Sequence, residues 1–220
     1  MSHDDNQRWL QAWRDSAICD FHQKKTNPLL MRFWNTLDLP PGSRIFVPLC
    51  GKSLDLLWLA DQGFEVIGIE ISPLAVKAFF HENRLPARHE RCGRLNLWRS
   101  GPISIYCGDI FSLQLEQLGH IDAVYDRAAL TAMPELLRAR YAEHLQSLLP
   151  VEASMLLLTI EDSEAASPGS QTDGIDHELS QLFSASYAIA LTHSESLNDR
   201  PDQPALSADC KVYHLTTHPA

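Results

Sequence analysis

The chain has 220 residues, 45% of them hydrophobic and 21% charged, which suits one compact domain with a core. The formal net charge is −10 and Lys and Arg form no run, which argues against a protein that binds nucleic acid by phosphate neutralisation. No apolar stretch is long enough to cross a membrane, and the polar start MSHDDNQRW does not resemble a signal peptide, so we expect a cytoplasmic protein with no membrane and no nucleic-acid partner.

Residues 1–39 precede the first predicted strand and carry an unusual number of aromatic side chains. Helices that pack on a sheet edge would explain them. A helical lid over a ligand would explain them too, because flat rings stack well on an adenine or an aromatic substrate. We predict one domain, 1–220, in which 1–39 forms an N-terminal helical lid.

From residue 44 onward, short β-rich runs alternate with stretches of helical spacing, which is typical of βαβ units with helices on both faces of a mostly parallel sheet. Several of the runs are almost continuously apolar, as expected for strands covered on both faces. The predicted helices cover 54–60, 73–84, 134–149 and 176–186. The seven predicted strands are 44–50, 65–71, 103–107, 121–125, 154–160, 187–193 and 210–217.

Gly51 follows the first predicted strand and Glu70 lies at the end of the second, at the edge where parallel α/β sheets bind ligands. A glycine there lets the backbone approach a ligand closely, and an acid about 20 residues later can accept hydrogen bonds from both ribose hydroxyls. The alternative is that Glu70 is a surface carboxylate. The full G-x-G-x-x-G fingerprint is absent, which disfavours a nicotinamide oxidoreductase, and Phe46 stands where a P-loop needs glycine.

Two later strand ends also carry polar residues. Cys107-Gly108-Asp109-Ile110 could hold an adenine ring. Asp126 and Arg127 end the fourth strand, either as a structural ion pair or with Arg127 clamping a ligand carboxylate through its guanidinium. Five cysteines show no C-x-x-C spacing, and the lone pair His89 and Cys92 lacks further ligands, so we expect no metal site and no disulfide framework.

Several strings together resemble the thiopurine S-methyltransferase family: VPLCGKSLDLLWLADQGFEVIGIEIS, YCGDIF, DAVYDRAALTAMP, and FHQ preceded by two tryptophans four apart. The resemblance implies a doubly wound, Rossmann-like methyltransferase fold of seven strands with the last one antiparallel, and S-adenosyl-L-methionine as cofactor. On this basis Trp13, Leu49 and Gly51 would contact the cofactor, Glu70 would hold its ribose, and Asp109 and Ile110 would flank the adenine.

The same resemblance implies which residues surround the methyl acceptor. Arg127 would lie near the methionyl carboxylate and the acceptor as the catalytic candidate, Phe21 would line the acceptor pocket, and Trp9 would be a further lid residue over the substrate. The chain departs from the family here, because ASPGSQTDGIDHELSQLF stands where a G-P-P-F segment is common. Thiopurine specificity is therefore not predicted.

The resulting prediction is methyl transfer to a small thiol or a related soft nucleophile, including selenium and tellurium compounds, by a monomer. Such nucleophiles are partly ionised near neutral pH, so alignment and dehydration matter more than a strong general base. Arg127 would favour the acceptor's anion. The alternatives are an O- or N-methyltransferase of a specialised metabolite, and a non-catalytic cofactor-binding module.

Overall fold

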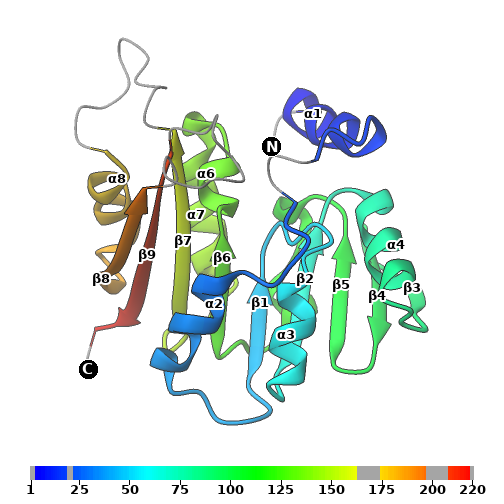
Figure 1. Cartoon of the computed structure of the whole chain (residues 1–220), viewed down its shortest axis with the longest axis horizontal. Helices are drawn as coiled ribbons and strands as arrows, with labels where there is room; N and C mark the ends of the chain where they lie inside the picture. Colours follow the sequence, from blue (N-terminus) through cyan, green and yellow to red (C-terminus); the bar gives the residue numbers. More distant parts are fainter. Residues whose placement is uncertain (1–2, 19–21, 163–173, 197–207, 219–220) are drawn as a thin grey trace. The chain divides into compact units, whose positions relative to one another are not determined.

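The computed structural model describes residues 3–18, 22–162, 174–196 and 208–218. They form two compact units, Met1–Tyr125 and Asp126–Ala220. In Figure 1 the chain runs from blue at the N-terminus to red at the C-terminus. Phe21, the predicted acceptor-pocket residue, lies outside the described residues.

The first unit begins with helices and continues as alternating strands and helices. Its elements are α1 (His3–Arg14), α2 (Pro28–Phe33), η1 (Trp34–Leu37), β1 (Arg44–Val47), α3 (Asp55–Asp61), β2 (Glu65–Glu70), α4 (Pro73–Glu82), β3 (Arg88–Cys92), β4 (Leu95–Ser100), β5 (Ile103–Cys107), η2 (Ile110–Ser112), α5 (Leu115–Leu118) and the first residues of β6 (Ala123–Arg127).

The strands of this unit are ordered β3-β4-β5-β2-β1-β6. β1 is parallel to both of its neighbours, β2 and β6, and β2 is parallel to β5, whereas β4 runs antiparallel to β5 and to β3. The chain therefore moves outward from β1 in one direction and then returns to its other side. Such a reversal marks the edge, at the carboxyl ends of the strands, where open α/β sheets bind ligands.

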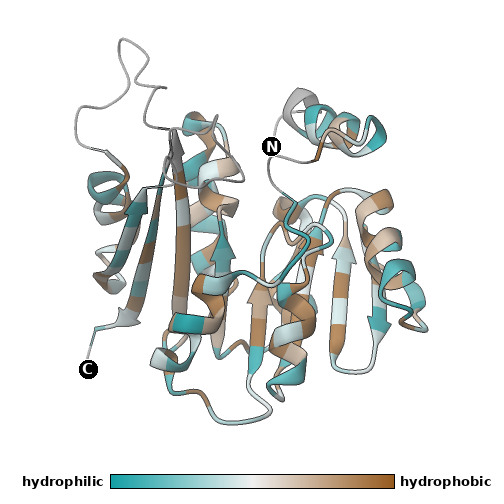
Figure 2. Cartoon of the chain, viewed as in Figure 1, coloured by the Kyte–Doolittle hydropathy of each residue, from teal (hydrophilic) through white to brown (hydrophobic). Residues whose placement is uncertain are grey.

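Burial of apolar side chains explains why these segments form a sheet. Ile45, Phe46, Val66 and Ile105 are fully or almost fully buried, and α3 and α4 both pack against β2 and β5. Figure 2 shows the hydrophobic residues concentrated on the central strands, while α1 is mostly hydrophilic. Burying such side chains stabilises the fold by about 1.5–3 kcal/mol each.

The two halves of segment 1–39 differ in burial. Trp34 is 1% exposed, and its ring meets the edges of Phe64 and Tyr125 at centroid distances of 5.7 and 6.2 Å. Asn27 caps α2 and its backbone N–H donates to the buried carboxylate of Asp55 at 2.8 Å. α2 and η1 are therefore part of the core, and only α1 has the placement expected of a lid.

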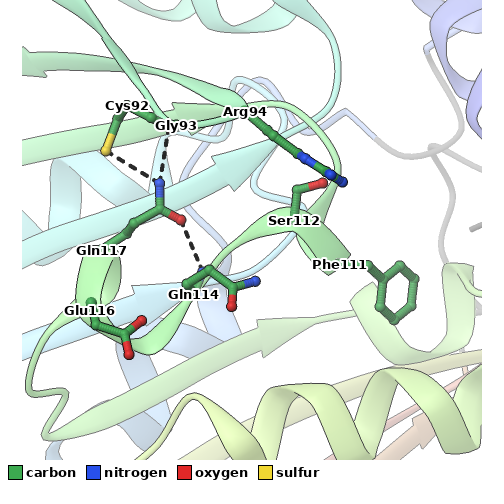
Figure 3. Close-up of a pocket in the computed structure, with 8 residues that line it drawn as sticks. All are labelled: Cys92, Gly93, Arg94, Phe111, Ser112, Gln114, Glu116 and Gln117. Carbon is green, nitrogen blue, oxygen red and sulfur yellow. Dashed lines mark hydrogen bonds between the residues drawn. The ribbon is translucent and has the colours of Figure 1, made fainter.

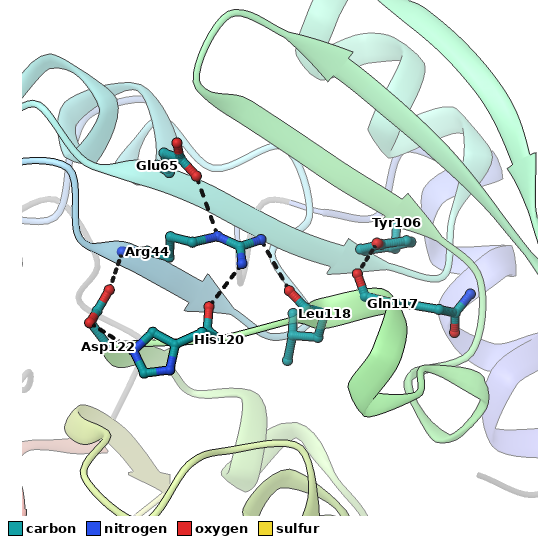
Figure 4. Close-up of polar contacts among 7 residues, drawn as sticks. All are labelled: Arg44, Glu65, Tyr106, Gln117, Leu118, His120 and Asp122. Carbon is teal, nitrogen blue, oxygen red and sulfur yellow. Dashed lines mark hydrogen bonds and ion pairs between the residues drawn. The ribbon is translucent and has the colours of Figure 1, made fainter.

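Arg44 ties the amino end of β1 to the connection that leads into β6. Its guanidinium donates to the carbonyl oxygens of His120 and Leu118 and pairs with Glu65, while its backbone N–H donates to Asp122 at 2.7 Å (Figure 4). This network lies at the opposite end of the strands from Glu70, so it supports the sheet rather than a site at the carboxyl ends.

The second unit contains an antiparallel sheet with helices. Its elements are the end of β6, α6 (Ala129–Ala132), α7 (Glu135–Ser147), β7 (Ser154–Asp162), α8 (Gly174–Phe183), β8 (Tyr187–Ser196) and β9 (Ala208–Thr217). β9 pairs antiparallel with both β7 and β8, with an irregularity between Leu191 and His193. Asp176 joins α8 to β9, because it accepts hydrogen bonds from Lys211 and Tyr213.

The α/β class, the parallel central strands and the antiparallel last strand confirm the predicted fold class. All seven predicted strands are present, and the described residues contain nine, because β3 and β4 form an additional hairpin. β3 (RHERC) has an almost entirely exposed pattern and no apolar alternation, which is why the hydrophobic pattern did not reveal it. The single domain remains a prediction. Across the described segments, no helix is both long and apolar enough to span a membrane.

Candidate functional site

Glu70 ends β2 and is held by backbone donors on both sides. One carboxylate oxygen accepts the N–H of Gly51 at 2.9 Å, and the other accepts the N–H of Ser72 at 2.7 Å. The residue is 5% exposed. Because a carboxylate oxygen can accept more than one hydrogen bond, each oxygen retains capacity for a hydroxyl donor.

Burial raises the pKa of Glu70 from its usual 4.5 to about 7, and the N–H groups of Ser72, Gly51 and Ile71 oppose that rise. The carboxyl group therefore changes charge near neutral pH in the ligand-free protein. A ligand that donates hydrogen bonds to the anion would pull the pKa down again.

The loop after β1 rests directly on β2. The N–H of Cys50 donates to the carbonyl of Ile69 at 3.0 Å, and a Cβ at Gly68 would lie 2.7 Å from the Cys50 Sγ. Leu49 and Gly51 both have positive φ, 46° and 56°. A left-handed conformation is strained for leucine, and such strain tends to occur where backbone geometry serves a ligand.

Helix α1 lies beyond the carboxyl ends of these strands (Figure 1). Its Trp13 covers Gly51 so closely that a Cβ at Gly51 would lie 3.3 Å from the indole Cζ2. Near the start of the helix, the Asn6 amide Nδ2 donates to Asp109 at 3.0 Å. Trp9, between them on the helix, is half-buried. α1 thus contacts the loops that follow both β1 and β5.

The junction after β5 also belongs to this cluster. The N–H of Gly108 donates to the carbonyl of Glu70 at 2.9 Å. Asp109 caps η2 by accepting the N–H of Phe111 at 3.1 Å, and Ile110 is 3% exposed. The first unit therefore brings together six predicted cofactor residues at three adjacent strand ends: Trp13, Leu49, Gly51, Glu70, Asp109 and Ile110.

Arg127 belongs to the second unit and is half-buried at the end of β6. It is followed by Ala128 at φ 57°, whose N–H donates to the carbonyl of Leu158 at 2.7 Å. Its neighbour Asp126 is fully buried and accepts hydrogen bonds from the Tyr141 hydroxyl at 2.7 Å and from the N–H of Ala129 at 2.8 Å. Asp126 therefore accepts the first N–H groups of α6, although Ala128 is the N-cap residue of that helix.

Two residues of this cluster were missed from the sequence. Ser72 supports Glu70 through its N–H and caps α4 through its hydroxyl, and Asn6 anchors α1. The position of Asn6 seven residues before Trp13, on one face of a helix, was the signal that could have revealed it.

A pocket of about 660 Å³ lies next to η2 (Figure 3). The Gln117 amide crosses it and donates to the carbonyl and the Sγ of Cys92. None of the predicted site residues lines it; those that do are Cys92, Gly93, Arg94, Phe111, Ser112, Gln114, Glu116 and Gln117.

Comparison with known proteins gives a match to the thiopurine S-methyltransferase family model over residues 4–217. The chain belongs to this family. A thiopurine S-methyltransferase of Stutzerimonas stutzeri is 52% identical, with 98% of this chain and 92% of that protein covered. One of Bordetella petrii is 40% identical over 96% of this chain and 98% of its own length.

Solved structures with low sequence identity share the fold. The Burkholderia thailandensis 1,6-didemethyltoxoflavin-N1-methyltransferase, solved with bound S-adenosylhomocysteine, has a TM-score of 0.65 at 13% identity and covers 97% of this chain and 87% of its own. A TehB-like SAM-dependent methyltransferase from Corynebacterium glutamicum has a TM-score of 0.56 at 15% identity, with 97% and 98% covered.

Family membership confirms the predicted enzyme class, an S-methyltransferase that uses S-adenosyl-L-methionine and a small-molecule acceptor. The chain's own residues fit this nucleoside. Glu70 has capacity for two hydroxyl donors, Trp13 lies directly against the Gly51 backbone beside it, and the buried Oδ1 of Asn6 has no hydrogen-bond partner among the described residues.

Proposed function

We propose that the chain transfers a methyl group to the sulfur of an aromatic or heteroaromatic thiol, with the nucleoside part of the cofactor held by Glu70, Gly51 and Trp13. Leu49, Asp109 and Ile110 complete this part of the proposed site. Selenium and tellurium compounds are included as acceptors because they share the polarisable, easily ionised nucleophile.

The Glu70 carboxylate is the observation that carries the proposal. It is buried at the end of a parallel strand, is oriented by two backbone N–H groups, and lies beneath a helix that reaches both neighbouring loops. A buried carboxylate fixed in this way, with acceptor capacity left over, suits the paired hydroxyls of a ribose.

The cofactor supplies a methyl group activated by a sulfonium. The task of the protein is then to align a nucleophile with it and to exclude water. A thiol needs no strong base, because a fraction of it is already ionised near neutral pH. In this proposal Arg127 raises that fraction by favouring the anion.

The proposal also assigns residues to the site of the methyl acceptor. Arg127 is the proposed catalytic residue, Phe21 and Trp9 are the proposed acceptor contacts, and α1 is the proposed lid. The buried Asp126, next to Arg127 in sequence, accepts the N–H of Ala129 at the start of α6, which supports a fixed backbone there. We also propose a cytoplasmic monomer without nucleic-acid partners; the net charge of −10 supports the last of these points.

Turnover on matched acceptors tests the proposal. Purified protein is given methyl-labelled cofactor and each of these: a thiopurine, a benzenethiol, an aliphatic thiol, selenite, tellurite, and the phenol and aniline that match the benzenethiol. Methylation of the thiols above the phenol and aniline supports sulfur as the acceptor. Faster turnover of the phenol or aniline would contradict it.

Calorimetry with S-adenosylhomocysteine separates binding from turnover. Uptake of this nucleoside without turnover of any acceptor would indicate a binding module rather than an enzyme. The Arg127→Gln variant then tests the catalytic residue: it removes the positive charge, so its pH–rate profile should shift towards that of the free thiol. An unchanged profile would remove Arg127 from the mechanism.

A further inference from the structure

The orientation of the Asn6 amide is fixed by its partner. Asp109 lies 3.0 Å from the Asn6 Nδ2, and a carboxylate can only accept hydrogen bonds. The NH₂ end of the amide must therefore face Asp109, which settles which end is nitrogen and which is oxygen. Oδ1 points away from Asp109 as a consequence.

That Oδ1 is buried and has no hydrogen-bond partner among the described residues. Buried polar atoms in folded proteins are almost always paired, so an unpaired acceptor in a fixed orientation calls for an explanation. A ligand that brings an N–H donor to this point would supply the missing partner.

The geometry of α1 places the helix that carries Asn6 over the proposed nucleoside site. Asn6 and Trp13 are seven residues apart, which is about 10.5 Å along a helix. They contact the loops after β5 and β1, and these strands flank β2 in the sheet, about 9.6 Å from each other. The two spans match, so the contact face of α1 crosses the end of β2, where Glu70 lies.

We propose that Asn6 determines specificity for the base of the cofactor: Nδ2 is held by Asp109, and Oδ1 accepts a hydrogen bond from the exocyclic amino group of adenine. This inference rests on the proposed function, because it requires the nucleoside at these strand ends. A base with oxygen in place of the amino group would present an acceptor to Oδ1 and be disfavoured.

The test compares two ligands by calorimetry: S-adenosylhomocysteine, and its analogue in which oxygen replaces the 6-amino group. The wild-type protein should prefer the amino form. In Asn6→Ala the preference should fall by about threefold to tenfold, which is the size of one neutral hydrogen bond. Asn6→Leu, which keeps the branching at Cγ, should give the same fall if the alanine variant folds poorly.

The ratio of the two affinities distinguishes recognition from a merely structural role. If Asn6 only anchored α1, its loss would weaken both ligands by the same factor and leave the ratio unchanged, and that result would overturn the inference. Gln7→Ala, an exposed neighbour on the same helix, is the matched control and should change neither affinity. Failure of the wild-type protein to bind either ligand would instead contradict the proposed function.

Discussion

Glu70 and Asp126 are two buried carboxylates at the carboxyl ends of parallel strands, and they differ in how their oxygens are occupied. The described partners of Glu70 are all backbone N–H groups, with Gly51 on one oxygen and Ser72 on the other, and Glu70 remains 5% exposed. Asp126 accepts two backbone N–H groups on one oxygen and the Tyr141 hydroxyl on the other, and is 0% exposed.

Burial raises the pKa of both groups, to about 7 for Glu70 and about 6 for Asp126. The perturbed pKa therefore does not separate a binding group from a structural one. The separation comes from spare acceptor capacity combined with residual exposure: Glu70 has both, whereas Asp126 is enclosed by the first N–H groups of α6 and by Tyr141. We expect substitution of Asp126 to affect stability, and substitution of Glu70 to affect binding.

The largest expected effect is on stability, in Asp126→Ala. The change leaves three buried donors without an acceptor: the Tyr141 hydroxyl and the N–H groups of Ala129 and Leu130. The free energy of unfolding should fall by about 3 kcal/mol, since each orphaned group costs about 1–3 kcal/mol. The measurement is urea unfolding at pH 5. At this pH, below the folded pKa of about 6, the Asp126 carboxyl is mostly neutral, so its removal relieves no buried charge that would offset the lost hydrogen bonds.

Asp122→Ala is the matched control for that change, since Asp122 lies just before the other end of β6. It is half-buried and holds the N–H of Arg44 at 2.7 Å, so its loss should cost only about 1 kcal/mol. An equal loss of unfolding free energy in the two variants would show that the burial of Asp126 does not make its hydrogen bonds more important for stability than those of Asp122.

The next effect concerns binding, in Glu70→Gln. Two ribose hydroxyls that donate to a charged carboxylate contribute about 1.5–3 kcal/mol each, so S-adenosylhomocysteine should bind about 100-fold more weakly. The free energy of unfolding should change by about 1 kcal/mol or less, because relief of the buried charge offsets one lost hydrogen bond. Calorimetry and urea unfolding measure the two effects separately.

Glu65→Gln is the control on the same strand, because Glu65 begins β2 and its side chain is 60% exposed. Its affinity for the nucleoside should equal that of the wild type. A Glu70→Gln variant with wild-type affinity but a large loss of stability would place Glu70 in the same structural role as Asp126.

The pH dependence of binding should be smaller than the effect of removing Glu70. The free protein holds a proton on Glu70 up to a pKa of about 7, and the ribose hydroxyls need the anion. Affinity should therefore rise by about tenfold per pH unit below pH 7 and level off above it. Glu70→Gln should give a flat profile.

Proton release gives an independent measure of the same linkage. Titration at pH 6.5 in two buffers of different ionisation enthalpy should show release of a fraction of a proton per nucleoside bound. Proton uptake, or affinity that falls as pH rises from 6 to 8, would contradict the assignment of Glu70.

The sequence predicted the strand-end geometry well because its signals are local. The spacing of Gly51 and Glu70 predicted that both would lie at the ligand-binding edge of the sheet, and the structure joins them by a 2.9 Å hydrogen bond. The role of Asp126 could not be predicted in this way. It depends on Tyr141, fifteen residues away on a helix, and no short motif encodes that contact.

The structure also divided the N-terminal segment, which composition alone treated as one lid. Trp34 and Trp13 are the same residue type, but Trp34 packs in the core and Trp13 covers a loop. Asn6 was missed because its seven-residue spacing from Trp13 is a weak signal by itself, and the importance of Asn6 follows from the position of Asp109. Tertiary neighbours, rather than residue types, separate these cases.

The smallest expected effect tests the loop that supports Glu70, in Gly51→Ala. The φ of 56° costs a non-glycine residue about 1 kcal/mol, and the new Cβ would lie 3.3 Å from Trp13, which must then shift by a few tenths of an ångström. Gly63→Ala shares the strain at φ 90° but has nothing within 4 Å of its Cβ, so the difference between the two variants isolates the Trp13 contact. S-adenosylhomocysteine should bind several-fold more weakly to the Gly51 variant and normally to the Gly63 variant, while both lose about 1 kcal/mol of stability. Equal affinities in the two variants would mean that Trp13 is not part of the binding surface, and that Glu70 is reached without α1.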